Sequence, residues 1–176
     1  ICLQLLHAGR YAYHPLSVAP ATLKAPINPF TPSALSSSAV DATIRAYANA
    51  AKLARDAGYD GVEVMGSEGY LINQFLSART NKRSDAWGGD VAQRMRFATE
   101  IVGRVREACG RDFIIVYRLS MLELVPVPAT TVEVPPGPAT VVRKLPPPAG
   151  VAPPLRTLGS SAMLTLLPEA SSCASI

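Results

Sequence analysis

The sequence predicts an α/β fold made of parallel βαβ units. Three short apolar segments, residues 1–6, 61–65 and 113–119, alternate with two longer segments whose apolar residues recur with helical period. The short segments are almost continuously apolar, as strands buried on both faces of a parallel sheet require. A doubly wound sheet and a (β/α)8 barrel both have this order, and both bind ligands at the carboxyl ends of their strands.

The first predicted strand, residues 1–6, leads into a long polar segment. This segment runs to residue 38, contains many prolines and shows no helical period. About thirty residues without regular structure far exceed the usual loop of roughly 4 to 6 residues, which favours a functional loop. His7 and Arg10 stand at its beginning.

The first predicted helix covers about residues 40–57 and packs on the sheet. Ser37 or Ser38 is its candidate N-cap, because a serine oxygen accepts hydrogen bonds from the free N–H groups of a first helical turn. Gly58 ends the helix. Its apolar face is formed by Ile44, Tyr47, Ala48, Ala51 and Ala54.

The second predicted helix begins at Asp90 and ends at Gly110. Asp90 and Gln93 have the spacing of a capping box, in which side chains at the two positions satisfy free backbone N–H groups. A single apolar stripe is predicted to face the sheet, and its residues are Val91, Met95, Ala98, Val102, Val105 and Cys109.

A long polar loop, residues 66–90, connects the strand at residues 61–65 to the second helix. Tyr70, several basic residues and a turn-forming glycine pair lie in this loop. Arg118 falls at the end of the third strand. Because the carboxyl ends of parallel strands meet at one edge, the loop and Arg118 are predicted to belong to an active site.

The composition excludes several classes of protein. The net charge of +4 comes from dispersed Lys and Arg residues, which gives no support for nucleic-acid binding. No apolar run approaches the roughly 18 residues of a membrane span. The three cysteines are odd in number and far apart, so neither a disulfide framework, a metal site nor an iron–sulfur spacing is indicated. A cytoplasmic protein without a metal is therefore expected.

The two ends of the sequence differ from its middle. The chain begins inside a predicted strand, at Ile1, which suggests a fragment. After residue 125 the sequence is rich in Pro, Ala and Val, and residues 126–176 are predicted to form an irregular tail beside a domain of residues 1–125. Either this tail is disordered, or the reading frame shifts near Leu124.

Four segments of the sequence together match a family pattern. They are residues 3–10 (LQLLHAGR), 66–76 (GSEGYLINQFL), 81–97 (NKRSDAWGG, then RMRF at its end) and 117–120 (YRLS). In this order they closely resemble the old yellow enzyme (NADH:flavin oxidoreductase) family, and most of all its bacterial 2,4-dienoyl-CoA reductase (NADPH) branch, over about residues 1–125. The resemblance implies a partial (β/α)8 TIM barrel, with about three strands and two helices, that holds FMN at its carboxyl-end mouth.

The resemblance assigns the flavin contacts to two residues. It implies that Gln4 hydrogen-bonds the pyrimidine edge of FMN and that Arg118 places a cation beside the N1–C2 carbonyl region. A fixed guanidinium stabilises the negative charge that reduced flavin carries there. Taken alone, a Gln in a strand and an Arg at a strand end are ordinary residues.

The resemblance also identifies Tyr70 as the catalytic proton donor. Reduction of a conjugated thioester needs a hydride on one carbon and a proton on another, and a phenol can supply the proton. Met65 and Glu68 stand where simple ene-reductases carry a His pair that binds the substrate carbonyl, which favours the dienoyl-CoA branch. Glu68 is expected either to tune the Tyr70 proton network or to be a solvated loop carboxylate.

Four consecutive residues of the loop are predicted to bind the substrate. By resemblance they lie where an acyl-CoA passes, and two cations with two hydroxyl or amide groups suit a ligand that carries phosphates. An alternative is structural, with Asn81, Arg83 and Asp85 holding the loop through mutual hydrogen bonds. The four residues are Arg79, Thr80, Asn81 and Lys82.

Two main hypotheses about function follow. The first is a flavin-dependent reductase of enoyl or 2,4-dienoyl-CoA that takes its electrons from NADPH. The second is a non-catalytic fragment, without the FAD, 4Fe–4S and NADPH sites of full-length family members, that binds FMN weakly or not at all and self-associates through open sheet edges. A phosphate-binding aldolase ranks lowest, because it needs a Schiff-base lysine at a strand end and neither Lys24 nor Lys52 lies on a predicted strand.

Overall fold

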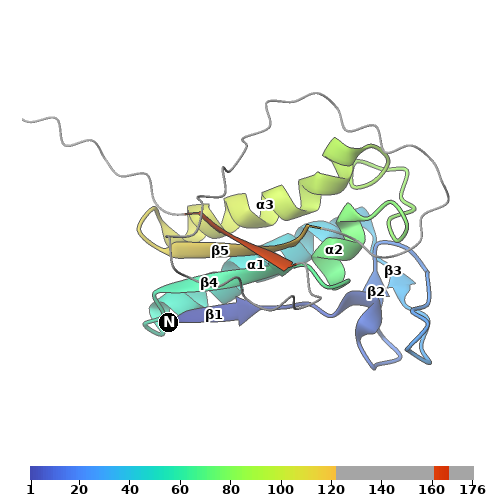
Figure 1. The fold of residues 1–176 in the computed structure, drawn as a ribbon, viewed down its shortest axis with the longest axis horizontal. Coiled ribbons are helices and arrows are strands. Elements are labelled where there is room, and N and C mark those ends of the chain that lie inside the picture. The colour runs from blue at the N-terminus through green and yellow to red at the C-terminus, as the bar shows by residue number, and fades with distance from the viewer. Residues whose placement is uncertain (122–160, 167–176) are drawn as a thin grey trace, which may run out of the picture.

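A four-stranded sheet forms the centre of the computed structural model, which describes residues 1–121 and 161–166. Its strands are β1 (Cys2–Leu5), β4 (Gly61–Gly66), β5 (Ile114–Ser120) and β6 (Ser161–Leu166), in the order β1-β4-β5-β6. The first three are parallel, and β6 runs antiparallel to β5 (Figure 1). The predicted parallel βαβ order is thus confirmed.

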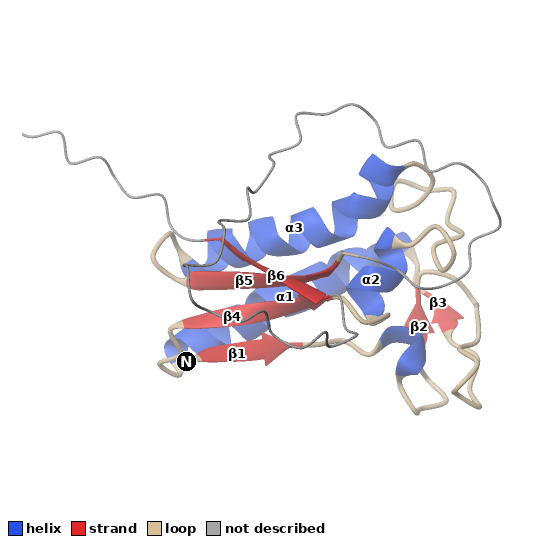
Figure 2. Ribbon diagram, viewed as in Figure 1, coloured by secondary structure: helices blue, strands red, loops and turns tan. Residues whose placement is uncertain are grey.

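Two long helices, α1 (Ser37–Asp56) and α3 (Val91–Cys109), lie side by side on one face of this sheet (Figure 2). Val62 and Val64 of β4 point toward them and are fully buried, as is Ile115 of β5. Removing this apolar surface from water is the main force that holds the helices to the sheet. Because successive side chains of a strand point to opposite faces, the residues that alternate with these buried ones lie on the other face of the sheet.

The predicted first helix is confirmed, but its N-cap was wrong by one or two residues. The helix begins at Ser37, so the capping residue is Ser36, whose Oγ accepts a hydrogen bond from the Ala39 N–H at 3.2 Å. Its end is as predicted, since Gly58 has a φ of 89°, a conformation that favours glycine. The buried face begins one turn earlier than predicted, at Val40, and Ala48 is only half-buried.

The second long helix is capped as predicted, because the Asp90 carboxylate accepts a hydrogen bond from the Gln93 N–H at 2.8 Å. The predicted apolar stripe was wrong near the start of the helix, where Val91 and Met95 are exposed. Phe97 turns inward instead, because its ring stacks on Phe75 with 4.1 Å between the centroids.

Short elements inside the two long loops were missed by the sequence prediction. The helix α2 (Leu71–Leu76) lies directly after Tyr70, and the first loop contains the turn η1 (Gly9–Tyr11) and the small parallel pair β2 (Val18–Ala19) and β3 (Ser33–Ala34). Elements of two to six residues are too short to show a period of apolar residues. All of them lie at the carboxyl end of the parallel strands (Figure 1).

The strand β6 lies within residues 126–176, which were predicted to be irregular, and is a departure from that prediction. It pairs with β5 from Ser161 to Leu166. The remaining part of the predicted tail, and the position of the hypothetical frameshift at Leu124, lie outside the described residues.

Candidate active site

Three polar side chains from neighbouring strands meet on the sheet face that points away from α1 and α3. Gln4 of β1 is opposite Glu63 of β4, and Arg118 of β5 is opposite Met65, two residues further along β4. The Gln4 Nε2 donates to Glu63 Oε1 at 2.7 Å, and the Arg118 Nε donates to the same oxygen at 3.0 Å. The structure therefore brings the two predicted flavin contacts together through one carboxylate, which the sequence prediction did not include.

Glu63 is held in its charged form by these two neighbours. Burial on the sheet would raise the pKa of Glu63, but the hydrogen bonds from Gln4 and Arg118 outweigh it and leave the pKa below its usual value. The carboxylate is 14% exposed, and a charge at that depth needs a partner. Reciprocally, the bond to Glu63 raises the pKa of Arg118, so its guanidinium stays charged.

Glu68 connects this cluster to the loop that carries Tyr70. Its Oε1 lies 3.6 Å from Arg118 Nη1, and its backbone N–H donates to Ser120 Oγ at 3.1 Å. Glu68 has a φ of 61°, which is uncommon for a residue other than glycine. This turn, which continues at Gly69 with a φ of 78°, follows directly after β4, and Glu68 lies beside Arg118.

The end of β4 packs closely on β5. A Cβ atom on Gly66 would lie 2.3 Å from the Tyr117 hydroxyl, so the position accepts only glycine. The next residue, Ser67, is buried and donates from Oγ to the Met65 sulfur at 3.2 Å. These contacts fix the path of the chain as it leaves β4, and the Met65 sulfur already accepts a hydrogen bond from within the protein.

Tyr70 stands at the N-terminus of α2 and is partly exposed. Its ring meets Tyr11 edge to face, with 6.2 Å between the centroids and 84° between the planes. The Leu71 N–H donates to the His7 carbonyl at 2.9 Å, which ties the start of α2 to the first loop. Burial lowers the pKa of His7, whose Nδ1 accepts from the Gly9 N–H at 3.1 Å. The Tyr70 ring is thus positioned by both long loops.

A buried glutamine that the sequence prediction missed, Gln74, joins the two loops. Its Oε1 accepts from the Arg10 N–H at 3.2 Å, and its Nε2 donates to the Gly69 carbonyl at 2.6 Å. A Cβ on Gly9 would lie 2.4 Å from that Oε1, so this turn also requires glycine. The available signal was a pair of polar residues, Asn73 and Gln74, inside a six-residue segment whose other four residues are apolar.

The four predicted substrate residues divide into two kinds. Thr80 and Asn81 are buried and bond the backbone: Thr80 Oγ1 donates to the Gln74 carbonyl at 2.7 Å, and Asn81 Nδ2 donates to the Phe75 carbonyl at 2.8 Å. Arg79 and Lys82 are exposed. The first pair shapes the loop, as in the structural alternative, and the second pair faces solvent.

Arg83 and Asp85 form the clamp of this loop. The Arg83 Nε donates to Asp85 Oδ1 at 2.9 Å, and its Nη1 donates to the backbone carbonyls of Leu35 and Pro20. Ser37 Oγ also donates to Asp85, at 2.7 Å. The Arg83 hydrogen bond holds the pKa of Asp85 well below its usual range. The predicted mutual bonding of Asn81, Arg83 and Asp85 is confirmed, since Asn81 Oδ1 accepts from the Arg83 N–H.

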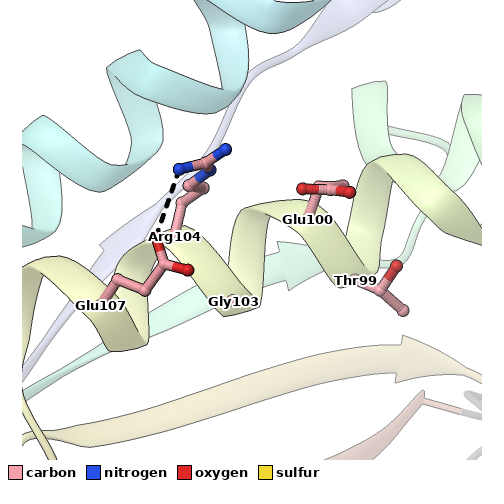
Figure 3. Close-up of a pocket in the computed structure, with 5 residues that line it drawn as sticks. All are labelled: Thr99, Glu100, Gly103, Arg104 and Glu107. Atoms are coloured by element: carbon pink, nitrogen blue, oxygen red, sulfur yellow. Dashed lines mark hydrogen bonds and ion pairs between the residues drawn. The ribbon is translucent and has the colours of Figure 1, made fainter.

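Other candidate features lie apart from this cluster. A surface hollow of about 250 Å³ is lined only by α3 residues and contains none of the predicted site residues (Figure 3). Within residues 1–121 and 161–166, no three His, Cys, Asp or Glu side chains are placed to hold a metal ion. No helix among those residues has the length and apolar character needed to cross a membrane.

The fold and the site define a class of protein: parallel βα units with an amide, a cation and a tyrosine loop at the carboxyl end of the sheet. Sequence comparison matches residues 1–146 to the NADH:flavin oxidoreductase / NADH oxidase family, about twenty residues beyond the resemblance predicted above. The chain belongs to this family.

Individual relatives agree with this assignment. The chain is 43% identical over 137 residues to a metal reductase of Desulforamulus reducens, covering 76% of this chain and 20% of that protein. Morphinone reductase superimposes with a TM-score of 0.62 at 34% identity, over 65% of this chain and 36% of that one. A complex of 2-naphthoyl-CoA reductase with 2-naphthoyl-CoA gives 0.61 at 33% identity, over 64% and 20%.

These relatives show what the described strands are. The chain spans between a fifth and about a third of their length, and its strands and helices form part of a (β/α)8 barrel rather than of a doubly wound sheet. The comparisons leave the 2,4-dienoyl-CoA branch as a prediction.

Proposed function

We propose that this chain carries the flavin and substrate contacts of an FMN-dependent reductase acting on conjugated enoyl or 2,4-dienoyl-CoA thioesters. The observation that supports it most is the joining of Gln4, Glu63 and Arg118 on the open sheet face, with Glu68 linking them to the loop of Tyr70. The proposed cofactor class follows from the family.

The residues present fit FMN. Gln4 is exposed and uses one amide hydrogen on Glu63, so its carbonyl and second N–H are left for the pyrimidine edge of a flavin. Arg118 keeps 32% of its side chain exposed, and its charge suits the negative region of a reduced ring. When bound, reduced FMN would supply the hydride.

Within this proposal, Tyr70 supplies the proton. The hydride goes to one carbon of the conjugated system, and the phenolic proton of Tyr70 goes to another, so that the C=C bond is reduced without a charged product. Edge contact with Tyr11 restrains the Tyr70 ring. Glu68 acts indirectly, by restraining Arg118 and the turn that precedes Tyr70.

The proposed substrate class rests on Met65 at the end of β4, on four residues of the following loop and on one structural relative. Met65 is buried and bonded to Ser67, so it offers no clamp for a simple enone carbonyl. The exposed cations of Arg79 and Lys82 suit the phosphates of CoA, while Thr80 and Asn81 hold their backbone in place. One structural relative is named as a CoA thioester reductase.

The proposal also includes the electron donor, the cell compartment and the partners. NADPH is the proposed donor by family resemblance. The cytoplasm stays the proposed compartment, because Cys2 and Cys109 are free thiols. Neither nucleic acid nor a membrane is a proposed partner, and β1, an edge strand of the described sheet, is the proposed surface for self-association.

The function is tested by reoxidation of the reduced flavin. The purified chain is saturated with FMN, reduced anaerobically and mixed with 2,4-hexadienoyl-CoA or with 2-cyclohexenone. Reoxidation by the thioester is expected to exceed reoxidation by the enone and by free reduced FMN. Tyr70→Phe should slow it by about 10²-fold or more, since the proton donor is lost, whereas Tyr59→Phe, distant in the fold on the α1–β4 turn, is the matched control.

Two outcomes would count against the proposal. Equal rates for the thioester and for the enone would remove the CoA specificity. A rate no greater than that of free reduced FMN would favour the second hypothesis, a non-catalytic chain.

A further inference from the structure

The carboxylate of Glu63 is the one charged group on the open sheet face that contacts both predicted flavin residues, within the described part of the chain. It accepts from the Gln4 amide at 2.7 Å and from the Arg118 Nε at 3.0 Å, and its second oxygen lies 3.4 Å from Arg118 Nη2. We propose that Glu63 is a positioning residue that sets the orientation of Gln4 and Arg118 toward a flavin. This inference rests on the proposed function.

The first step concerns which way the Gln4 amide points. A carboxylate only accepts hydrogen bonds, so it must face the NH2 end of the amide. The Gln4 carbonyl oxygen is thereby turned away from Glu63, with the second N–H beside it. Gln4 then presents an acceptor and a donor next to each other, the pattern that pairs with an imide edge.

The second step concerns Arg118. A guanidinium has five N–H groups in a rigid fork, and here Nε and Nη2 face Glu63 while Nη1 faces Glu68 at 3.6 Å. Two carboxylates thus hold the plane of the fork from two sides. The side chain stays 32% exposed, so the restrained cation is accessible to a ligand.

The third step separates this arrangement from a purely structural ion pair. Within the described residues, the side chains of Gln4 and Arg118 bond other side chains, and neither donates to a backbone carbonyl. Val62 and Val64, on the other face of β4, carry the packing of the strand. Glu63 therefore contributes mainly to the direction of two side chains and little to the core.

The substitution Glu63→Gln tests this role, because it keeps the shape and removes the charge. The amide replaces one accepting oxygen, the one that faces Arg118 Nη2, with an NH2 group, and it removes the charge that strengthens the bonds from Gln4 and Arg118, so the orientation of both side chains should become less fixed. FMN affinity, measured by fluorescence titration of the full chain, is expected to fall at least tenfold. Glu107→Gln, which removes an equal charge from the exposed α3 surface, should leave the affinity within twofold.

A destabilised control excludes a merely structural effect. Val62→Ala removes buried core volume from the same strand and should lower the thermal midpoint more than Glu63→Gln does. Its FMN affinity should nevertheless stay within twofold of the starting chain. FMN affinity that is unchanged in Glu63→Gln, or that follows the thermal midpoint across both variants, would overturn the inference.

A second measurement decides the matter if the starting chain binds no FMN, in which case the proposed function fails by itself. In the flavin-free chain, NMR resonances of the Gln4 side-chain amide and of the Arg118 Nε–H report their local bonding. Displacement of both resonances in Glu63→Gln, with no displacement in Glu107→Gln, would support the positioning role. Unmoved resonances in Glu63→Gln would contradict it.

Discussion

Two arginine–carboxylate pairs in this chain have the same chemical groups but different roles. Arg83 is 9% exposed, and besides Asp85 it bonds the backbone carbonyls of Leu35 and Pro20. Arg118 is 32% exposed, and its recorded partners are the side chains of Glu63 and Glu68. An arginine whose donors bond the backbone fixes a loop, whereas one held only by carboxylates at the mouth of a sheet remains available to a ligand.

The largest expected effect comes from removing the cation of the loop clamp. Arg83→Met removes the cation that bonds Asp85 and leaves the carbonyls of Leu35 and Pro20 without this donor, and should lower the free energy of unfolding by about 2 to 3 kcal/mol. Urea denaturation followed by circular dichroism measures it. Arg104→Met, which removes an exposed pair with Glu107, should change it by less than about 0.5 kcal/mol. Equal losses of unfolding free energy in the two variants would contradict the structural role given to Arg83.

A comparison of two glutamines extends the same contrast. Gln74 is buried and bonds the backbone of both loops, so Gln74→Leu should lower the free energy of unfolding by about 2 kcal/mol, because buried polar groups lose their partners. Gln4→Leu, on the exposed face, should cost less than about 0.5 kcal/mol. Denaturation of both variants under identical conditions measures the difference, and a costly Gln4→Leu would contradict the assignment of Gln4 to ligand binding.

Low pH should weaken the ion pair between Arg83 and Asp85. Because Arg83 lowers the pKa of Asp85 from 3.8, the pair stabilises the folded chain fully above that pH, and this stability is lost as the pH falls below it. The loss should be about 1 kcal/mol, since Asp85 is 36% exposed and partly screened. It should be absent from Asp85→Asn. Thermal midpoints measured from neutral pH to below 3.8 check this, and identical pH profiles for both proteins would refute it.

A smaller loss of stability than at the Arg83–Asp85 pair is expected at the ligand-facing pair. Arg118→Met removes an accessible guanidinium that bonds side chains only, and the Gln4 amide still donates to the half-buried Glu63, so the free energy of unfolding should fall by about 1 kcal/mol, well below the loss in Arg83→Met. Denaturation beside Arg83→Met is the measurement. A loss as large as that of Arg83→Met would mean that Arg118 is part of the structural framework.

Much of the fold was predictable, because long elements have a period that short ones lack. Helix α1 and the cap of α3 at Asp90 followed from spacing alone, but the six residues of α2 could not show a period. Phe97 was missed for a different reason, since its burial depends on a stacking partner from another element. Which apolar residues face inward is decided by neighbours as well as by periodicity.

Prediction of the site from the sequence has the same limit. Gln4, Tyr70 and Arg118 were identified because they lie in motifs shared with a family. Glu63 was not, because an acidic residue in a short strand has no meaning until the register places it between Gln4 and Arg118. Gln74 was missed for the same reason: one of its partners, the Arg10 N–H, lies in a loop 64 residues earlier.

The most direct test of the central claim is an equilibrium titration of the full chain with FMN, followed by flavin fluorescence. We expect saturable binding, even if weak, that falls at least tenfold in Arg118→Met and stays within twofold in Arg104→Met. Binding that is absent, or that is equal in the chain and in Arg118→Met, would contradict the assignment of this sheet face to a flavin.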